Sequence, residues 1–370
     1  MEDKVFNKKP FLLYCLLILS VAAYYFLAYQ TARENFFQVF GLFTFLFVVF
    51  FISYKLFSAT HFKYLIIAGI VFRILLLFSI PNLSEDVYRF IWDGRLAANG
   101  INPFSHLPAD IMQMPAITGI SKELYLQLNS VDHYTIYPPV LQGIFWSGAK
   151  LFPENVYAAI VFFKCIILLF EVGTLFVMLQ ILKKLSLPKH LSLLYILNPL
   201  VITELTGNAH FDGVMIFFVL LSFLLILKNK WQASAIFLGL GIAAKLLPIL
   251  FLPLIIKKKL GWKKGLLYSI VTGGTTIVLF ALVFDIATIQ HMLNSIDLFI
   301  RKFEFNASVY YVIRYIGTLI KGYNIIAVAG PFLILLSSLI TILISSKEKK
   351  FTEISIFNKA LFIISIWFFF

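Results

Sequence analysis

Apolar runs of roughly 17 to 25 residues recur along the whole chain, separated by short polar gaps, and each is long enough to cross a hydrocarbon core as one helix. We therefore expect an all-α fold, a polytopic transmembrane helical bundle of about nine to eleven spans. The runs that predict these spans lie at about 11–29, 36–54, 64–80, 156–182, 190–206, 212–227, 265–284, 324–345 and 354–370.

Lysines fill the gaps between these runs, and the positive-inside rule assigns such gaps to the cytoplasm. The gaps contain Lys4–Lys9, Lys55 and Lys63, Lys183–Lys189, Lys228 and Lys230, Lys257–Lys264 and Lys347–Lys350. The same rule places 81–155, 207–211, the surroundings of Lys245 and 285–323 on the non-cytoplasmic side. The stretches 137–152 and 309–320 cannot be full spans without inverting later lysine gaps, so we predict interfacial or re-entrant helices there.

One apolar stretch, Trp231–Ile256, is too long for a single span and is interrupted by Lys245, Pro248 and Pro253. We predict two short helices that meet near the outer face. No internal repeat or low-complexity linker is visible, so we expect one integral membrane domain over residues 1–370, with its active site in the outer loop 81–155. The chain ends on Trp367–Phe370 inside an apolar run, which is compatible with a further span or tail.

Composition supports the membrane prediction, because 61% of the residues are hydrophobic and 13% are charged, against about 25% charged in soluble domains. The net charge of +13 does not indicate a nucleic-acid partner, because the basic residues sit in short gaps between apolar runs. Cys15 and Cys165 both lie inside apolar runs and have neither disulfide nor metal-ligand spacing.

The first outer segment predicts a short helix over residues 85–98. Ser84 suits the N-cap, and Asn99-Gly100 suits the helix end. Asp86, Arg89 and Asp93 are spaced by three and four residues and would share one face of this helix.

The acids of this helix have two interpretations. Glu85 and Asp86 would favour the helix N-terminus through its dipole, which needs no further role. Arg89 and Arg95 lie within two turns of them, at a depth where a phosphate headgroup would sit. This combination favours a site for a phosphate-bearing substrate.

A second polar cluster, Asp132–Gln142, contains His133 and Tyr137, followed by two prolines that fix an extended approach to a short apolar helix. A simple loop-to-helix anchor explains it equally well.

A third cluster, Asn198–Gly213, contains Glu204, His210 and Asp212. Glu204 lies just inside a predicted span, where a carboxylate is costly unless it is paired or faces a wet cavity. His210 and Asp212 have the residue types of metal ligands, but a two-residue spacing is weak evidence, and a helix-start role for Asp212 is favoured.

The fourth cluster is basic and aromatic and contains Arg301 and Arg314. Positive charge on the outer side runs against the positive-inside rule, so it indicates either an anionic ligand or a lipid-headgroup anchor. Inside the predicted spans, Arg73, Lys164 and Glu171 are either buried partners of one another or snorkelling groups.

These motifs together resemble the GT-C superfamily of polytopic glycosyltransferases. The closest resemblance is to bacterial polyprenyl-phosphate-mannose-type mannosyltransferases, including those of glycosyltransferase family 87, and it spans about residues 64–320. The residues that carry it are Ser84–Arg89, Trp92–Arg95, Asn102–Phe104, Tyr137–Pro139, Asn198-Pro199 with Glu204, Asn208–Asp212 and Phe305-Asn306.

The resemblance implies a polyprenyl-phosphate-linked sugar as donor and a lipid or glycan acceptor, in the bacterial inner membrane with the active site on the non-cytoplasmic face. It also implies an acidic base in the first outer loop, which is Asp86 here, with Glu85 as the second candidate. The larger members of the superfamily carry a soluble C-terminal domain, and we expect this chain to depart from them there, since residues 1–370 show no such segment.

The chemistry fits these residues. A polyprenyl phosphate leaves without a proton, so an inverting transfer needs one carboxylate to deprotonate the acceptor and cations for the phosphate. The candidates for binding donor or acceptor are Arg89, Arg95, Asp93, His133, Tyr137, Glu204, His210, Asp212, Lys245, Arg301 and Arg314. Whether a divalent cation assists is open at this level.

Three other functions are considered. A transporter or flippase of a lipid-linked saccharide would need ionisable residues near the midplane and repeat symmetry, whereas the acids here gather on the outer side and no repeat is visible. A polysaccharide ligase or polymerase shares the donor chemistry but does not require the Ser84–Arg95 block. A membrane protein without catalytic activity leaves the acids that gather on the outer side, among them Glu85, Asp86 and Asp93, unexplained.

Overall fold

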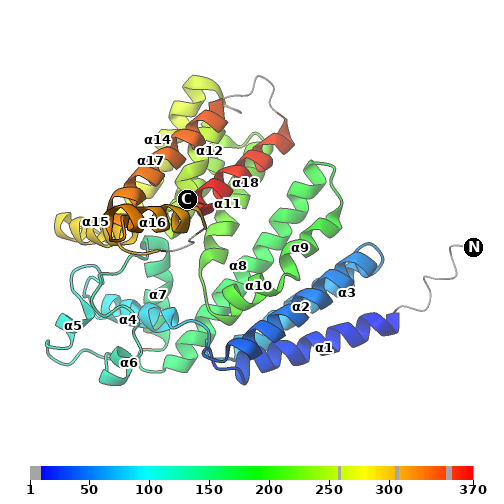
Figure 1. The fold of residues 1–370 in the computed structure, drawn as a ribbon, viewed down its shortest axis with the longest axis horizontal. Helices are drawn as coiled ribbons and strands as arrows, with labels where there is room; N and C mark the ends of the chain where they lie inside the picture. The colour runs from blue at the N-terminus through cyan, green and yellow to red at the C-terminus, as the bar shows by residue number, and fades with distance from the viewer. Residues whose placement is uncertain (1–9, 257–259, 305–307, 347–351, 370) are drawn as a thin grey trace, which may run out of the picture. The chain divides into compact units, whose positions relative to one another are not determined.

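The computed structural model describes residues 10–256, 260–304, 308–346 and 352–369, and within these ranges all regular secondary structure is helical (Figure 1). Pro199 begins a short helix at its first position, where its missing N–H costs nothing.

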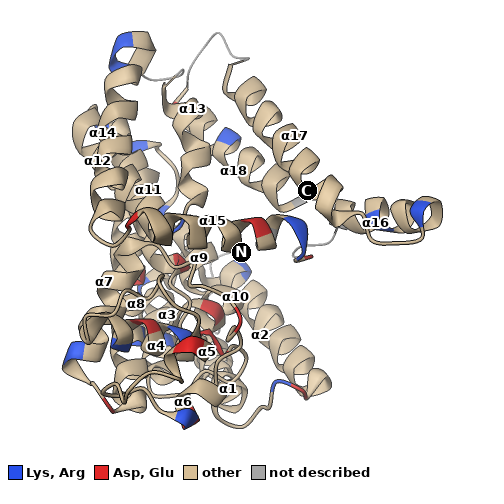
Figure 2. Ribbon diagram, turned by 90° about the vertical axis from the view of Figure 1, so that its left-hand side faces the viewer, with Lys and Arg blue, Asp and Glu red and all other residues tan. Residues whose placement is uncertain are grey.

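Five of the described helices are long and apolar enough to cross a membrane, namely α1 (Pro10–Tyr29), α2 (Phe36–Phe57), α8 (Val156–Lys184), α14 (Gly261–Ala281) and α17 (Ile326–Ser346). A sixth span is present if Pro199–Gly207 and Asp212–Leu227, which are bent by 115°, count together. α1 carries no charged residue and α2 carries Lys55 in its last turn (Figure 2). The predicted polytopic helical bundle is confirmed, and the chain is a multi-pass membrane protein.

The predicted number of spans, nine to eleven, is larger than the five or six that the described helices support, for two reasons. Three predicted spans form helices of 16, 16 and 17 residues, which are α3 (Phe62–Leu77), α11 (Asp212–Leu227) and α18 (Glu353–Phe369). The predicted span 190–206 is divided into short helices, namely η2 (Lys189–Ser192), α9 (Leu193–Ile196), α10 (Pro199–Val201) and the π-helix η3 (Ile202–Gly207).

The predicted shorter helices are confirmed as helices. They are α4 (Asp86–Ala98), α7 (Pro139–Leu151), α12 (Trp231–Ala244) and α16 (Ser308–Lys321). Lys245 ends α12 in extended backbone, and η4 (Leu247–Phe251) and α13 (Leu252–Ile255) follow it. The remaining helices are α5 (Pro108–Ile111), α6 (Lys122–Leu126) and α15 (Ile286–Arg301).

The chain forms two compact units. The first contains Met1–Gly100, Pro115–Val131 and Gln142–Leu220, and the second contains Ile101–Met114, Asp132–Leu141 and Leu221–Phe370. The prediction of a single domain over residues 1–370 stays a prediction.

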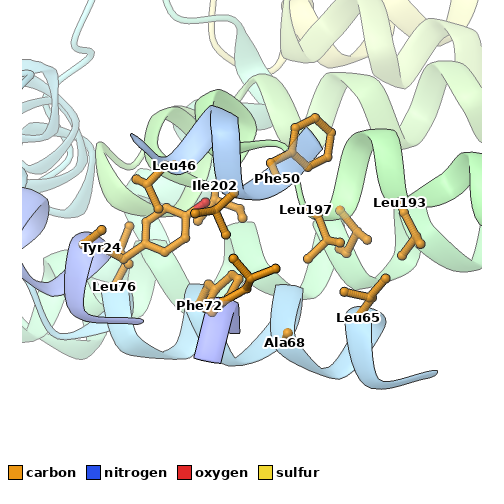
Figure 3. Close-up of a cluster of buried hydrophobic side chains, with 14 of the residues drawn as sticks. Tyr24, Leu46, Phe50, Leu65, Ala68, Phe72, Leu76, Leu193, Leu197 and Ile202 are labelled. Carbon is orange, nitrogen blue, oxygen red and sulfur yellow. The ribbon is translucent and has the colours of Figure 1, made fainter. Parts of the chain in front are cut away.

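The apolar core of the first unit brings α1, α2 and α3 against α9 and η3 (Figure 3). Tyr24 and Phe72, both buried, have ring centroids 4.9 Å apart. A Cβ on Gly69 would meet the Ile196 carbonyl oxygen at 2.7 Å, so the backbones of α3 and α9 approach closely. Lipid tails are as apolar as these side chains, so close packing and polar pairs must hold the helices together.

A buried ion pair supplies such polar contacts. Arg73 in α3 donates from Nε to Glu171 in α8 at 2.7 Å, and both side chains are fully buried. Arg73 also donates to the carbonyls of Gly69 and Ile196, and Thr206 in η3 donates to Glu171 at 2.6 Å. The structure thus identifies Arg73 and Glu171 as buried partners and ties η3 to two long helices.

Lys164 of α8 is also buried, and its Nζ donates to the carbonyls of Leu76 and Ser79. These carbonyls lie at the C-terminal end of α3, where a positive charge complements the helix dipole. Lys164 therefore fixes the point at which the chain leaves α3 toward α4.

In the second unit α12 and α14 pack closely, since a Cβ on Gly239 would meet Thr272 and Thr275 at under 3.0 Å. Buried Ser222, Ser234 and Tyr268 form a hydrogen-bonded cluster in the same unit. These small and polar residues are typical of helix contacts in membranes.

Candidate functional site

Asp86 is the first residue of α4, and its half-buried carboxylate has neighbours from three segments of the first unit. Oδ1 accepts a hydrogen bond from Asn129 Nδ2 at 2.7 Å. Oδ2 lies 3.8 Å from Nε2 of His210. One oxygen is thus fixed by an amide while the other faces an imidazole.

The cap of α4 differs from the prediction. The residue before the helix is Glu85, whose side chain makes no capping bond, and Ser84 is one residue further back. The Ser84 hydroxyl lies 3.0 Å from His210 Nε2 and 3.4 Å from the backbone nitrogen of Asp86. Ser84 therefore links His210 to the start of α4.

His210 lies in the turn 208–211 between η3 and α11. Its Nδ1 is 3.0 Å from Oε2 of Glu204, and its backbone N–H donates to the Glu204 carbonyl. The preceding residue, Ala209, is fully buried and has a φ of 59°, in the left-handed region that few residues other than glycine adopt. A π-helix beside a strained turn is an arrangement often found at functional sites.

The acidic surroundings of His210 determine its protonation. Burial alone would lower its pKa, but the hydrogen bond and charge of Glu204, with the charges of Asp86 and Asp212, outweigh burial and raise the pKa above its ordinary value. The acidic neighbours therefore stabilise the imidazolium form relative to an imidazole in water.

Arg89 and Asp93 share a face of α4 with Asp86, as the helical spacing predicts. Arg89 donates from Nε to Asp93 at 2.8 Å, and both side chains are almost fully buried. Gln142 of α7 donates to the second Asp93 oxygen at 3.1 Å, and Arg89 also binds the Ser130 carbonyl at 3.0 Å. This network fixes α4 against α7 and the loop before it, and substrate binding by Arg89 or Asp93 stays a prediction.

Arg95 points the other way. In a helix of about 3.6 residues per turn, positions 86 and 95 face about 180° apart. Arg95 Nη1 donates to the Gly119 carbonyl at 2.6 Å, and the side chain lines a cavity of about 570 Å³. Burial lowers the pKa of Arg95, and the charge of Glu154 partly offsets that effect.

Asp212 is the first residue of α11, which agrees in position with the predicted helix-start role. Throughout the described ranges, no group of three or more His, Cys, Asp or Glu side chains is arranged to hold a metal ion. Involvement of a divalent cation stays untested.

Five candidates belong to the second unit, and the structure describes them there. His133 Nδ1 lies 2.7 Å from the Asp132 carbonyl, and Tyr137 follows two residues after buried Thr135. Arg301 pairs with Asp297 at 2.6 Å, Arg314 pairs with Glu304, and Lys245 is exposed at the end of α12. Their roles toward substrate stay predictions, and Phe305-Asn306 lies outside the described residues.

Sequence reasoning missed Asn129 as a partner of Asp86. The two residues are 43 positions apart, and no local spacing relates them. It also missed Arg33, whose Nη1 lies 3.9 Å from exposed Glu85.

Comparison with known proteins identifies the family. A family model described as MptA_B family, alpha-(1->6)-mannopyranosyltransferase, N-terminal domain, matches residues 19–259, well over half of the chain. The match includes Asp86, Glu204 and His210. No curated protein and no solved structure matches the chain. The mannosyltransferase resemblance of the sequence is thereby confirmed: the chain belongs to the alpha-(1->6)-mannopyranosyltransferase family and is a glycosyltransferase.

Proposed function

We propose that this enzyme transfers mannose from a polyprenyl-phosphate donor to a lipid or glycan acceptor on the non-cytoplasmic face of the bacterial inner membrane, with inversion. The observation that carries the proposal is the Asp86 carboxylate, which is held on one oxygen by Asn129 and open on the other beside His210. The family match supports mannose as the sugar.

The reaction requires little beyond positioning. The acceptor hydroxyl gives its proton to Oδ2 of Asp86 while its oxygen attacks the anomeric carbon. The bond from that carbon to the phosphate oxygen breaks on the opposite face, and the phosphate leaves with the electron pair. A single displacement of this kind inverts the anomeric centre.

His210 has a supporting electrostatic role in this proposal. The raised pKa of His210 means that its neighbours stabilise the imidazolium, which would place a positive charge beside the Asp86 carboxylate. Glu204 neutralises the same imidazolium from the other side. The two acids thus hold the charge of His210 in place between them.

Asp86 is a better candidate for the base than Glu85. The Glu85 side chain is 55% exposed, and its nearest charged partner is Arg33 at 3.9 Å. A carboxylate held in one orientation and partly shielded from water is a more effective base than a mobile exposed one.

The orientation in the membrane rests on charge. Lys55 and Lys63 flank the loop between α2 and α3, so the positive-inside rule assigns that loop to the cytoplasm. The predicted span 64–80, which contains most of α3, would then carry the chain to the opposite side, just before Asp86.

The test compares purified wild type with Asp86→Asn and Glu85→Gln, each given radiolabelled polyprenyl-phosphate mannose and native membrane lipid acceptors. The Asn substitution preserves shape but removes the base, so we expect transfer to fall by a factor of about 100 or more, with Glu85→Gln close to wild type. Equal transfer by Asp86→Asn would contradict the assignment. If wild type consumes no donor with any sugar but binds lipid-linked saccharides, a transporter is the better description.

A further inference from the structure

A cavity lies against the face of α4 that points away from Asp86. Tyr88 and Arg95, seven residues and almost two full turns apart, line it from α4. The loop around Gly119, helix α6 and the first turns of α8 complete the wall, and the volume is about 570 Å³. This is the size of a small-ligand pocket.

The lining combines aromatic rings with polar groups. Tyr88 and Tyr157 contribute rings, while Ser121, Gln127 and Glu154 contribute hydrogen-bonding groups. Sugars present apolar C–H faces for aromatic contact and hydroxyls that donate to carboxylates and accept from amides and guanidinium groups. The mixture matches the chemistry of a hexose.

Arg95 provides the second observation. Its side chain is 3% exposed, and its Nε and Nη2 atoms are buried without a hydrogen-bond partner in the described part of the chain. Buried donors of this kind normally find an acceptor, and leaving them unpaired is costly. A ligand oxygen that approached Arg95 from the cavity would satisfy them once the guanidinium turned toward it, because both nitrogens are covered in the structure.

The charged side chains that line the cavity favour a neutral ligand over a phosphate. Glu123 and Glu154 line the cavity together with Arg95 as its only cation among the described lining residues, so a phosphate would meet two carboxylates. A neutral ligand avoids this repulsion and uses both signs of charge.

The geometry points to a non-catalytic pocket that binds neutral hexose residues of the acceptor glycan, on the far side of α4 from Asp86. This inference rests on the proposed transferase function for the identity of the glycan. A free oligosaccharide and a membrane glycolipid share the hexose chemistry, and the lining, which includes the apolar side chains of Ile80 and Ile160, fits the hexose of either source.

A glycine in the cavity wall allows two segments to pack closely there. Gly119 has a φ of 81°, and a Cβ there would meet the Pro153 carbonyl at 2.3 Å and Arg95 Cδ at 2.9 Å. Glycine therefore allows the loop to lie directly over the guanidinium.

The test measures, by saturation-transfer NMR, how tightly a short mannooligosaccharide binds to the purified protein. Wild type is compared with Gln127→Ala and Glu154→Gln. Both residues are exposed, so these variants should fold, and Glu34→Gln, an exposed carboxylate outside the pocket, is the matched control. We expect each pocket variant to bind at least about fivefold more weakly and to raise the acceptor KM by the same factor without lowering kcat.

Binding unchanged in both pocket variants would overturn the inference, as would inorganic phosphate competing as well as the sugar. Vesicles containing a mannosylated lipid, compared with free oligosaccharide, distinguish the two sources. Asp86→Asn separates the two proposals: it should retain saccharide binding while losing transfer, so the pocket can stand even if the proposed reaction fails.

Discussion

Nδ1 of His210 lies 3.0 Å from Oε2 of Glu204, so this imidazole is tied to the π-helix that precedes its own turn. Its other nitrogen, Nε2, is left to face Ser84 and Asp86 at the start of α4. The contact therefore couples the η3–α11 turn to the segment that carries the proposed base.

The raised pKa of His210 predicts a pH-dependent stability. Its protonation stabilises the fold fully below the ordinary value of 6.5, and this contribution is lost as pH rises through the higher folded-state pKa. Unfolding in detergent, measured over a pH series, should show that loss in wild type. Glu204→Gln removes the partner carboxylate, so the loss should shrink and its midpoint should move to lower pH. An unchanged profile would show that Glu204 does not set the His210 pKa.

Asn129 should matter for rate because its amide orients Asp86. Asn129→Ala removes one hydrogen bond worth about 0.5 to 1.5 kcal/mol, so we expect kcat to fall roughly twofold to tenfold. Asn129→Asp is the sharper variant: it replaces the amide donor with a second carboxylate that repels Asp86, so kcat should fall further than in Asn129→Ala. Identical kinetics in all three proteins would rule out this contact as an orienting one.

Gly94 should be intolerant of a side chain, since a Cβ there would meet the Phe145 carbonyl oxygen at 2.2 Å. Gly94→Ala must push α4 from α7, at a cost of about 1 to 3 kcal/mol, and should lower both stability and transfer. Gly143→Ala is the matched control, because nothing lies within 4 Å of a Cβ at that helical position. It should be neutral or stabilising by up to about 1 kcal/mol. Comparable losses in the two variants would contradict the close α4–α7 packing.

Because Arg73 and Glu171 form a buried pair, we expect that substitutions of the two residues do not have additive effects on stability. Arg73→Leu alone leaves a buried carboxylate without its partner and should destabilise by about 3 to 5 kcal/mol. Arg73→Leu combined with Glu171→Leu should recover much of that loss, because no charge then remains unpaired. Denaturant unfolding in micelles checks this, and a double variant as unstable as the single one would argue against a direct pair.

Much of the fold follows from the sequence, because run length and proline position predict helices and their breaks. The site is only partly predictable. Helical spacing placed Asp86, Arg89 and Asp93 on one face, but it could not show that Arg89 and Asp93 bind each other while Asp86 binds Asn129. Such contacts depend on tertiary packing between segments that are far apart in the chain.

The conformation of the turn that carries His210 could not be predicted from the sequence. Residue propensities do not predict a π-helix, nor an alanine in the left-handed region at 209. The prediction of Ser84 as the N-cap was wrong. It considered only the neighbouring helix, whereas the Ser84 hydroxyl lies near the imidazole of His210, 126 residues further along the chain.

The contacts of Arg73 depend on segments that are synthesised later than α3. Its carboxylate partner lies 98 residues further along the chain and its Ile196 carbonyl partner lies 123 residues further. When α3 emerges from the ribosome, neither exists, and an unpaired arginine in the middle of a span opposes insertion by about 2.5 to 3.5 kcal/mol. The complete set of contacts around Arg73 can therefore form only after α8 and the segment that follows it have been synthesised.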